Sequence, residues 1–238
     1  ALRAPVIIDG RELITTTSIG ISVYPEDSRE PAQLIKNADI AMYRAKNDGR
    51  DSFQLYQPTM NARSLEHLAL ETALHRAIER NELTLHYQPV VRVADGHTIG
   101  VEALLRWQHP DLGLVSPGEF IPLAEESGLI VPIGAWVLRN ACIQHRLWRE
   151  RGLAPLQLMV NISVRQFRRD DFFDEVVHVL TETGMQPERL TLEVTETLLM
   201  ETGDNSITVL GKLRALGIRI AIDDFGTGYS SLAYLKRF

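Results

Sequence analysis

Three apolar segments separated by helical stretches decide the fold: LQLMVNIS (156–163), LTLEVTE (190–196) and IRIAIDDFG (218–226). They are rich in Val, Ile and Leu, which is typical of buried strands. The stretches between them are long enough for a crossover helix, so the strands should run parallel in right-handed units. This alternation predicts an α/β fold with a parallel sheet, either an open doubly wound sheet or a (β/α) barrel.

The two strands before these segments should pair differently. LHYQPVV (85–91) and IGVEALLRW (99–107) are joined through Asp95-Gly96. This connection is too short for a crossover, and Asp-Gly favours a tight turn, so the pair should be antiparallel.

Residues typical of helix ends occur between the predicted strands. Ser116 and Glu119 have the spacing of a capping box, with Pro117 at the first helical position. Glycines are expected at three helix ends, namely Gly152, Gly184 and Gly217.

Acidic and amide side chains stand where the apolar strands end: Glu102, Asn161, Glu193, Glu196, Asp223 and Asp224. Strands usually end in Gly, Asn or Ser, so repeated acids need a reason beyond turn chemistry. Reacting groups of a barrel lie at the carboxyl ends of its strands, whereas an open sheet binds at one switch point and draws on two strands. The barrel is therefore favoured.

Side-chain alternation allows these groups to converge. Glu102 shares its strand face with Arg106, and Asn161 shares its own with Ser163. Asp223 and Asp224 would diverge in an extended strand, so one could serve a first metal and the other a second. Glu196 lies off the face of Glu193 and is better placed to hold a loop.

The donor set restricts the metal. Asn, Glu and Asp offer only oxygen, and none of the seven histidines lies beside them in the motifs, which favours Mg²⁺ or Mn²⁺ over zinc or copper. Several close carboxylates could not all stay ionised without a cation. Each residue has an ordinary alternative: Glu102 could pair with Arg106, and Asn161 or Asp223-Asp224 could form turns. Together, however, four strand ends would need unrelated explanations.

Composition limits the classes of function. The chain has 238 residues, 45% of them hydrophobic, and a net charge of −6, which argues against nucleic-acid or anionic-membrane partners. The single cysteine, Cys142, is expected in the core and suits a reducing, cytoplasmic compartment. No apolar run of membrane-spanning length and no signal peptide is seen. Both ends are expected to be cuts from a longer protein, with any membrane attachment through regions outside this sequence.

The first 56 residues form a separate small pattern. PVII and RELITTTSIGISVYP flank Asp9-Gly10 as a hairpin, and residues 18–23 alternate as a half-buried strand. A helix with Pro31 in its first turn follows and is stopped by Asn47, Asp48 and Gly49, and a short strand at SFQLY comes next. QPTMNAR (57–63) is predicted to be a linker before a helix that carries Leu70 and Leu74.

The motifs VEALLRW, FIPLAEESGLI, VNIS, LEVTE and DDFGTGYSSL resemble the EAL-domain family. The resemblance implies a cyclic di-GMP phosphodiesterase on a (β/α)8 TIM-type barrel with an antiparallel first strand. TTTSIGISVYP and ADIAMYRAKNDGRDSF resemble the carboxyl-terminal half of a GGDEF (diguanylate cyclase) domain. The implied domains are a partial GGDEF-like segment at 1–56, a linker at 57–63 and an EAL-like barrel at 64–238 that is truncated after its fifth strand.

The resemblance also implies roles for single residues. Four would bind a first metal, namely Glu102, Asn161, Glu193 and Asp223. Asp224 would help to bind a second metal, and Glu196 would steady the DDFGTG loop. Gln88 and Arg106 would contact cyclic di-GMP. Glu102, Asp223, Asp224 and Glu196 would thus form the catalytic set with two Mg²⁺ or Mn²⁺ ions, and the product would be linear pGpG.

Departures from the family leave alternatives open. The sequence stops where the family would add a sixth strand with a Lys, then a further Glu and a Gln, so little activity is expected of this fragment alone. Open sheet edges would favour self-association, with a homodimer as one outcome. Without the GGDEF signature, no cyclase activity is assigned. A catalytically silent cyclic di-GMP receptor is the main alternative, although intact LEVTE and DDFGTG argue against it. A Mg²⁺-dependent enzyme acting on a carboxylate or enolate would need a Lys or His base, and none is visible in the motifs.

Overall fold

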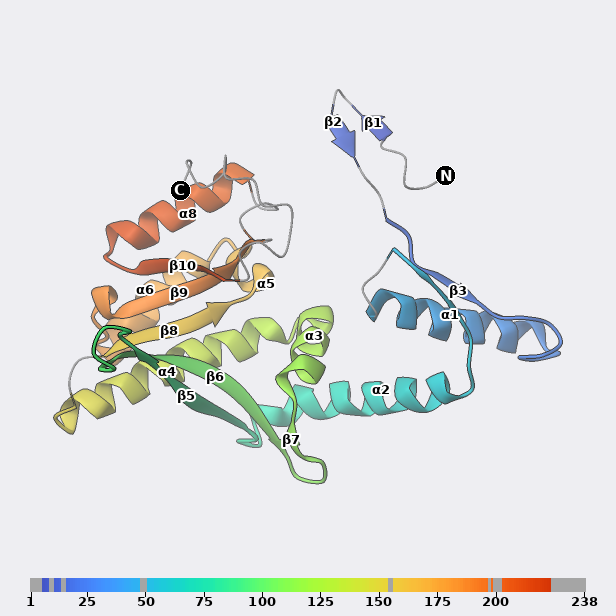
Figure 1. Ribbon diagram of the computed structural model, residues 1–238, viewed down its shortest axis with the longest axis horizontal. Helices are drawn as coiled ribbons and strands as arrows, with labels where there is room; N and C mark the ends of the chain where they lie inside the picture. The colour runs from blue at the N-terminus through green and yellow to red at the C-terminus, as the bar shows by residue number, and fades with distance from the viewer. Residues whose placement is uncertain are drawn as a thin grey trace. The chain divides into compact units, whose positions relative to one another are not determined.

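The chain forms two compact units, Ala1–Leu70 and Glu71–Phe238. This computed structural model describes residues 6–8, 11–13, 16–47, 51–153, 156–196, 198 and 203–223 (Figure 1). Helix α2 (Thr59–Ala77) crosses the boundary between the units, so most of the predicted linker at 57–63 is helical. No Gly or Pro follows Pro58 within this helix, and the helical pattern therefore starts earlier than expected. The division into domains at 57–63 stays a prediction.

The first unit contains two small pairs of strands. β1 (Val6–Ile8) and β2 (Arg11–Leu13) pair antiparallel, which confirms the predicted hairpin, while Asp9-Gly10 itself lies outside the described residues. β3 (Ile19–Ile21) and β4 (Phe53–Leu55) pair in parallel, connected through α1 (Pro31–Asn47). The helix predicted to begin around Pro31 and to stop around Asn47 is confirmed.

Gly20 brings β3 unusually close to α1. A Cβ atom at this position would lie 1.9 Å from the carbonyl oxygen of Ala38 and 2.2 Å from the backbone nitrogen of Met42. The face of β3 that carries the small residue Gly20 therefore packs against the helix. The large side chains point away, and Ile19 is 47% and Phe53 63% exposed. The strand is half-buried as predicted, but its buried side is the one with the smaller residues.

Replacing Gly20 by Ala should destabilise the first unit by about 3 kcal/mol, because the new methyl group would clash with backbone atoms of α1, which must move. Hydrogen exchange of the amides of β3 and α1 measures this loss in the whole protein. Ser22→Ala is the matched control. The Ser22 hydroxyl is buried with no hydrogen-bond partner among the described residues, so its removal should be neutral or stabilising. Equal protection in Gly20→Ala and Ser22→Ala would contradict the close approach.

The second unit is built on one mixed sheet in the strand order β10-β9-β8-β6-β5. Its strands are β5 (Leu83–Val91), β6 (Thr98–His109), β8 (Gln157–Ile162), β9 (Leu190–Thr195) and β10 (Arg219–Asp223). β5 is antiparallel to β6, and the other neighbours run parallel, as predicted. A short strand that was not predicted, β7 (Gly113–Val115), pairs antiparallel with the end of β6.

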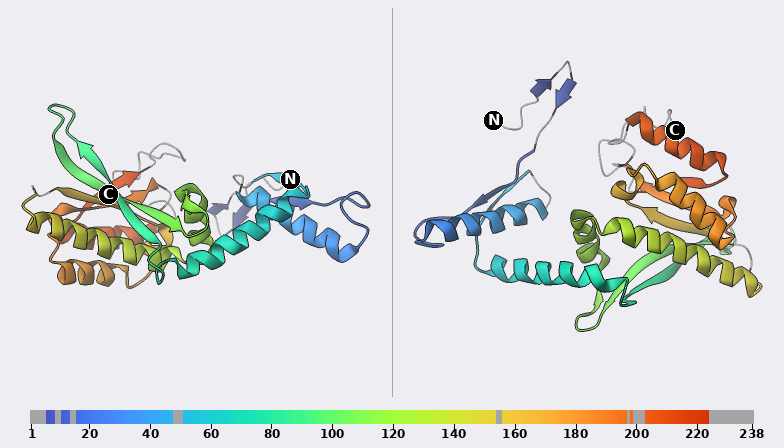
Figure 2. Two further views of the ribbon diagram at one scale, coloured as in Figure 1. Left: turned by 90° about the horizontal axis from the view of Figure 1, so that it is seen from below. Right: turned by 180° about the vertical axis from the view of Figure 1, so that it is seen from behind.

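Helices cover one face of this sheet. They are α3 (Pro117–Ser127), α4 (Ile130–Glu150), α5 (Val164–Phe167), α6 (Phe172–Thr183) and α8 (Gly203–Ala215), with a 3-10 turn η1 (Pro187–Arg189). In the view from below, α4 and α6 lie on the same side of the strands (Figure 2). The ring of Tyr87 on β5 packs edge-on against Trp148 of α4, with centroids 4.7 Å apart. The buried core fills this side and includes Val160, Leu192 and Cys142.

The strand order favours a barrel over a doubly wound sheet. Among the described strands of the sheet path, neighbours follow the chain order without the reversal that creates a switch point. The sheet with its helices on one side is an incomplete (β/α) barrel with an antiparallel first strand, as predicted.

Helix ends agree with the sequence at the glycines but not at Ser116. Gly152, Gly184 and Gly217 all have positive φ, as expected. Ser116 is the N-cap of α3 but makes no side-chain cap hydrogen bond. The backbone N–H of Glu119 instead donates to the carbonyl oxygen of Ser116 at 2.9 Å, which leaves the hydroxyl without its usual donor. The predicted capping box is therefore wrong.

No single described helix is long and apolar enough to cross a membrane. Helices α3 and α4 meet the length and composition criteria only as a pair, with a bend of 120° between them.

Candidate metal and substrate site

The face of the sheet opposite α4 carries the predicted site residues. In the parallel register Asn161 lies beside Glu193, and Glu193 lies beside Ala221, two residues before Asp223. Glu102 lies beside Met159, two residues before Asn161. Because side chains two residues apart share a face, Glu102, Asn161, Glu193 and Asp223 all project from one side. The convergence predicted from side-chain alternation is thus present in the strand register.

Two of these residues are in direct contact. The Asn161 side-chain nitrogen Nδ2 donates a hydrogen bond to Glu102 Oε1 over 2.9 Å. The amide thereby partly compensates the carboxylate charge. A rotation that exchanges Nδ2 and Oδ1 would turn the same side chain into an oxygen donor for a cation shared with Glu102.

Glu193 is electrostatically coupled to the acids beside it. Partial burial, and then the negative charges of Glu102 and Asp223, raise its pKa from 4.5 to about 7. Carboxylates on two other strands of the sheet, β6 and β10, thus act on the Glu193 carboxylate. A cation between them would remove this repulsion and allow all three to be ionised.

The donor set fits a hard divalent cation. Within the described ranges, no group of three or more His, Cys, Asp or Glu side chains is gathered closely enough to hold an ion by itself. The set on this face is mixed, because an amide stands beside the carboxylates, and Asp224 lies outside the described residues. Carboxylate and amide oxygens suit Mg²⁺ or Mn²⁺ when such an ion is bound.

Polar side chains continue along the same face onto β5. Gln88 is directly opposite Glu102 in the antiparallel pair, so the two share the site face, and Gln88 is exposed. His86 lies opposite Leu104 on this face and is also exposed. Sequence motifs did not single it out, and the alternation His86-Tyr87-Gln88 was the signal that could have done so.

Arg106 lies on the site face but does not pair with the neighbouring acid Glu102. It shares the face of Glu102, four residues further along β6. Among the described residues its guanidinium makes one hydrogen bond, from Nη1 to the carbonyl oxygen of Leu105 at 2.8 Å, and no ion pair with Glu102. The alternative interpretation of Glu102 and Arg106 as an ion pair is therefore wrong.

Glu196 follows the last residue of β9 and is only 8% exposed. Its burial distinguishes it from the more open residues of the site face. The DDFGTG loop that it was expected to hold lies beyond Asp223 and outside the described residues, so this role stays a prediction.

The cap at the carboxyl end of β8 was missed by sequence reasoning. Ser163 and Gln166 form a complete capping box at the start of α5, although α5 is only one turn long. The spacing Ser-x-x-Gln was the available signal.

The fold and the site together define a TIM-type α/β barrel domain with a candidate divalent-metal site at the carboxyl ends of its strands. Comparison with known families agrees: the "EAL domain" profile matches residues 71–238, and "Diguanylate cyclase, GGDEF domain" matches residues 1–52. The chain belongs to the EAL-domain family, with a GGDEF region at its N-terminus, which confirms both resemblances.

Relatives of known name support this placement. "Bifunctional diguanylate cyclase/cyclic di-GMP phosphodiesterase MucR" of Pseudomonas aeruginosa is 49% identical over 236 residues, 99% of this chain and 34% of that protein. "Cyclic di-GMP phosphodiesterase PdeR" of Escherichia coli is 42% identical over 237 residues, 100% of this chain and 36% of that protein. The solved structure "PaMucR Phosphodiesterase, c-di-GMP complex" is 52% identical with a TM-score of 0.69, covering 71% of this chain and 69% of that chain. The chain thus spans about a third of the length of these curated relatives.

Proposed function

We propose that this chain is part of a metal-dependent phosphodiesterase that hydrolyses cyclic di-GMP to linear pGpG. The observation that carries the proposal is the face formed by Glu102, Asn161, Glu193 and Asp223, where partial burial and the charges of Glu102 and Asp223 raise the pKa of Glu193. The names of the relatives MucR and PdeR support the substrate.

The acids and the amide of this face would hold the metal. Glu102, Asn161, Glu193 and Asp223 would bind a first Mg²⁺ or Mn²⁺, and Asp224 would help to bind a second. When bound, such a pair lowers the pKa of a water molecule and stabilises charge on the phosphoryl oxygens.

The reaction is the addition of water to one phosphodiester bond of the ring. The water oxygen forms a new bond to phosphorus, the bond from phosphorus to the 3′ oxygen breaks, and that oxygen leaves with a proton, which opens the ring to pGpG. Gln88 and Arg106 would bind the dinucleotide, and the guanidinium would orient a phosphate through paired N–H donors.

Arg106→Ala should raise the KM for cyclic di-GMP by about 10–100-fold, because a hydrogen-bonded charge that faces the phosphate is lost. Arg106→Lys should recover only part of the affinity, since an ammonium cannot make the two parallel hydrogen bonds. Steady-state kinetics at saturating Mn²⁺ measures both. An unchanged KM in Arg106→Ala would exclude the arginine from substrate binding.

A catalytically silent receptor for cyclic di-GMP is the second candidate. The two are separated by incubating the full-length protein with cyclic di-GMP and Mg²⁺ or Mn²⁺ and following pGpG. The phosphodiesterase releases pGpG in a metal-dependent way, whereas a receptor binds the dinucleotide without converting it. A cytoplasmic location and a homodimer stay predictions, as does the absence of a nucleic-acid partner.

A further inference from the structure

We propose that Gln166 and Gly134 form a lock that sets the position of Asn161, which makes Gln166 a positioning residue of the candidate metal site. The inference rests on the proposed function, because it concerns the same site. The lock is defined here as the Gln166 side chain, its hydrogen bonds to Ser163 and its contact with Gly134.

The first half of the lock is a set of hydrogen bonds just beyond β8. Gln166 Oε1 accepts from the backbone nitrogen of Ser163 at 3.2 Å and from its hydroxyl at 3.1 Å. In return the backbone nitrogen of Gln166 donates to Ser163 Oγ at 3.2 Å. Ser163 follows the last residue of β8 and is two residues from Asn161. These bonds fix the backbone where the strand turns into α5.

The second half of the lock is the close approach to α4. Gln166 is 3% exposed. A Cβ atom on Gly134 would lie 1.9 Å from Gln166 Nε2, 2.1 Å from Cδ and 2.3 Å from Oε1. Gly134 lies inside α4 and does not have positive φ, so space alone requires glycine there. The Gln166 side-chain amide therefore lies directly between α4 and the turn that follows β8.

Core packing alone does not explain why a glutamine occupies position 166. Gln166 Nε2 is buried and has no hydrogen-bond partner among the described residues, which is unfavourable. A methionine of similar length could fill the same space without that cost. The oxygen end of the amide supplies what a methionine cannot, because it accepts both donors of Ser163.

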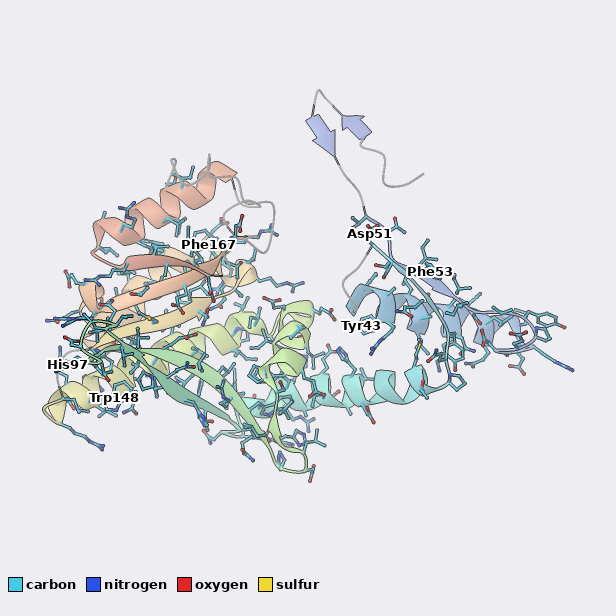
Figure 3. All side chains as sticks on the ribbon, viewed as in Figure 1. Tyr43, Asp51, Phe53, His97, Trp148 and Phe167 are labelled. Atoms are coloured by element: carbon cyan, nitrogen blue, oxygen red, sulfur yellow. The ribbon has the colours of Figure 1, made fainter. Side chains whose placement is uncertain are left out.

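The lock is connected to the candidate metal site through the short segment between Ser163 and Asn161. α5 is also held by an aromatic contact, since the ring of Phe167 (labelled in Figure 3) lies against that of Phe172 with centroids 5.5 Å apart. Asn161, two residues before Ser163, donates to Glu102 at 2.9 Å. A shift of the turn would therefore displace the amide that donates to Glu102. Residues that orient metal ligands in this way typically change metal affinity or activity by about 10–100-fold when they are replaced.

The first test compares Gln166→Met with Gln166→Glu in the full-length protein. Gln166→Met keeps the volume but loses the acceptor, so the half-saturating Mn²⁺ concentration should rise by about 10–100-fold, measured by direct Mn²⁺ titration and by hydrolysis. Gln166→Glu keeps an acceptor for Ser163 and should recover most of the affinity. In the metal-free protein, hydrogen exchange at the Ser163 and Gln166 amides should be faster in Gln166→Met than in Gln166→Glu.

The second test uses the glycine. Gly134→Ala should expel the amide and weaken Mn²⁺ binding by a similar factor. Gly211→Ala is the matched control, because Gly211 is also helical and a Cβ there meets nothing within 4 Å. Gly134→Ala combined with Gln166→Ala removes the clash. If the lock positions Asn161, the double variant regains thermal stability but not Mn²⁺ affinity. If Gln166 only fills space in the core, the double variant regains both thermal stability and Mn²⁺ affinity, and this result would overturn the inference.

The inference and the proposed function can fail separately. Glu102→Gln, measured in parallel, tests the metal site itself. Normal Mn²⁺ affinity in Glu102→Gln would overturn the proposed site. Impaired binding in Glu102→Gln with wild-type Mn²⁺ affinity in Gln166→Met would overturn only the lock.

Discussion

Glu102→Gln is expected to abolish Mg²⁺- or Mn²⁺-dependent hydrolysis of cyclic di-GMP, with a loss on the order of a thousandfold, larger than that for residues that only orient metal ligands. The amide of glutamine keeps the shape of the side chain and can still accept the hydrogen bond from Asn161. The negative charge and its full donor strength are lost. Glu102→Ala should have the same effect on hydrolysis while also leaving Asn161 without this acceptor.

The measurement is the rate of pGpG formation by the full-length protein over a range of Mn²⁺ concentrations. Glu79→Gln is the control, because Glu79 is an exposed acid beyond the end of α2 and outside the sheet. Circular dichroism should show that both variants are folded. Wild-type turnover in Glu102→Gln would rule out a metal-binding role for this residue.

The geometry of the site face was predictable because it depends on a fixed period. Side chains of a strand alternate with period two, so residues such as Glu102 and Arg106 had to share a face once β6 was recognised. Parallel pairing then aligned Asn161 with Glu193. What remained open was which face the helices would cover, and the contact of Tyr87 with Trp148 decides it.

The helix caps show where sequence patterns are insufficient. Ser116 with Glu119 and Ser163 with Gln166 have the same spacing, yet only the second pair forms a capping box. At Ser116 the backbone carbonyl accepts the N–H of Glu119, whereas at Ser163 the hydroxyl accepts the N–H of Gln166. The choice between these acceptors depends on local backbone geometry, which the residue types alone do not specify.

Close contacts between segments far apart in the chain could not be predicted from the sequence either. Gly134 and Gln166 belong to different elements, and neither carries a signal for the other in the sequence. The same is true of Gly20 and its contact with α1. Glycine at such positions serves the approach of another segment rather than a turn, and only the coordinates of both segments reveal it.

The site extends across the whole described sheet. Gln88 lies on β5 and Asp223 on β10, the two outermost strands of the sheet path, and the other predicted site residues of the described strands lie between them. A metal bound at Glu102, Asn161, Glu193 and Asp223 would therefore cross-link four strands. Metal binding and the stability of this unit should be coupled for this reason.

Glu193→Gln is expected to separate stability from metal binding. The pKa of Glu193 in the folded protein, about 7, lies above its ordinary value of 4.5. The folded state therefore binds this proton more tightly than the unfolded state does. The stability that comes from the neutral carboxyl is complete below about pH 4.5 and is lost as the pH rises through about 7. Without metal, ionised Glu193 then weakens the fold, because it is partly buried and faces Glu102 and Asp223.

Glutamine at this position stays neutral at every pH. In EDTA at pH 8, the free energy of unfolding of Glu193→Gln should exceed that of the wild type by about 1–2 kcal/mol, a value that allows for the solvated half of the side chain. At pH 4.5 the difference should nearly vanish, since the wild-type carboxyl is then protonated. Denaturant unfolding at both pH values measures this, with Glu79→Gln as the variant that should follow the wild type.

Mn²⁺ should reverse the order of stability at pH 8. The ion binds to the ionised wild-type site and stabilises it through mass action, whereas Glu193→Gln lacks one ligand charge and should gain much less. The affinity of the wild type for Mn²⁺ should increase as the pH rises through about 7, because the proton on Glu193 competes with the ion. Glu193→Gln could instead prove less stable than the wild type at both pH values without metal. The Glu193 carboxyl would then stabilise the fold, for example through a hydrogen bond, and would not destabilise it by charge repulsion.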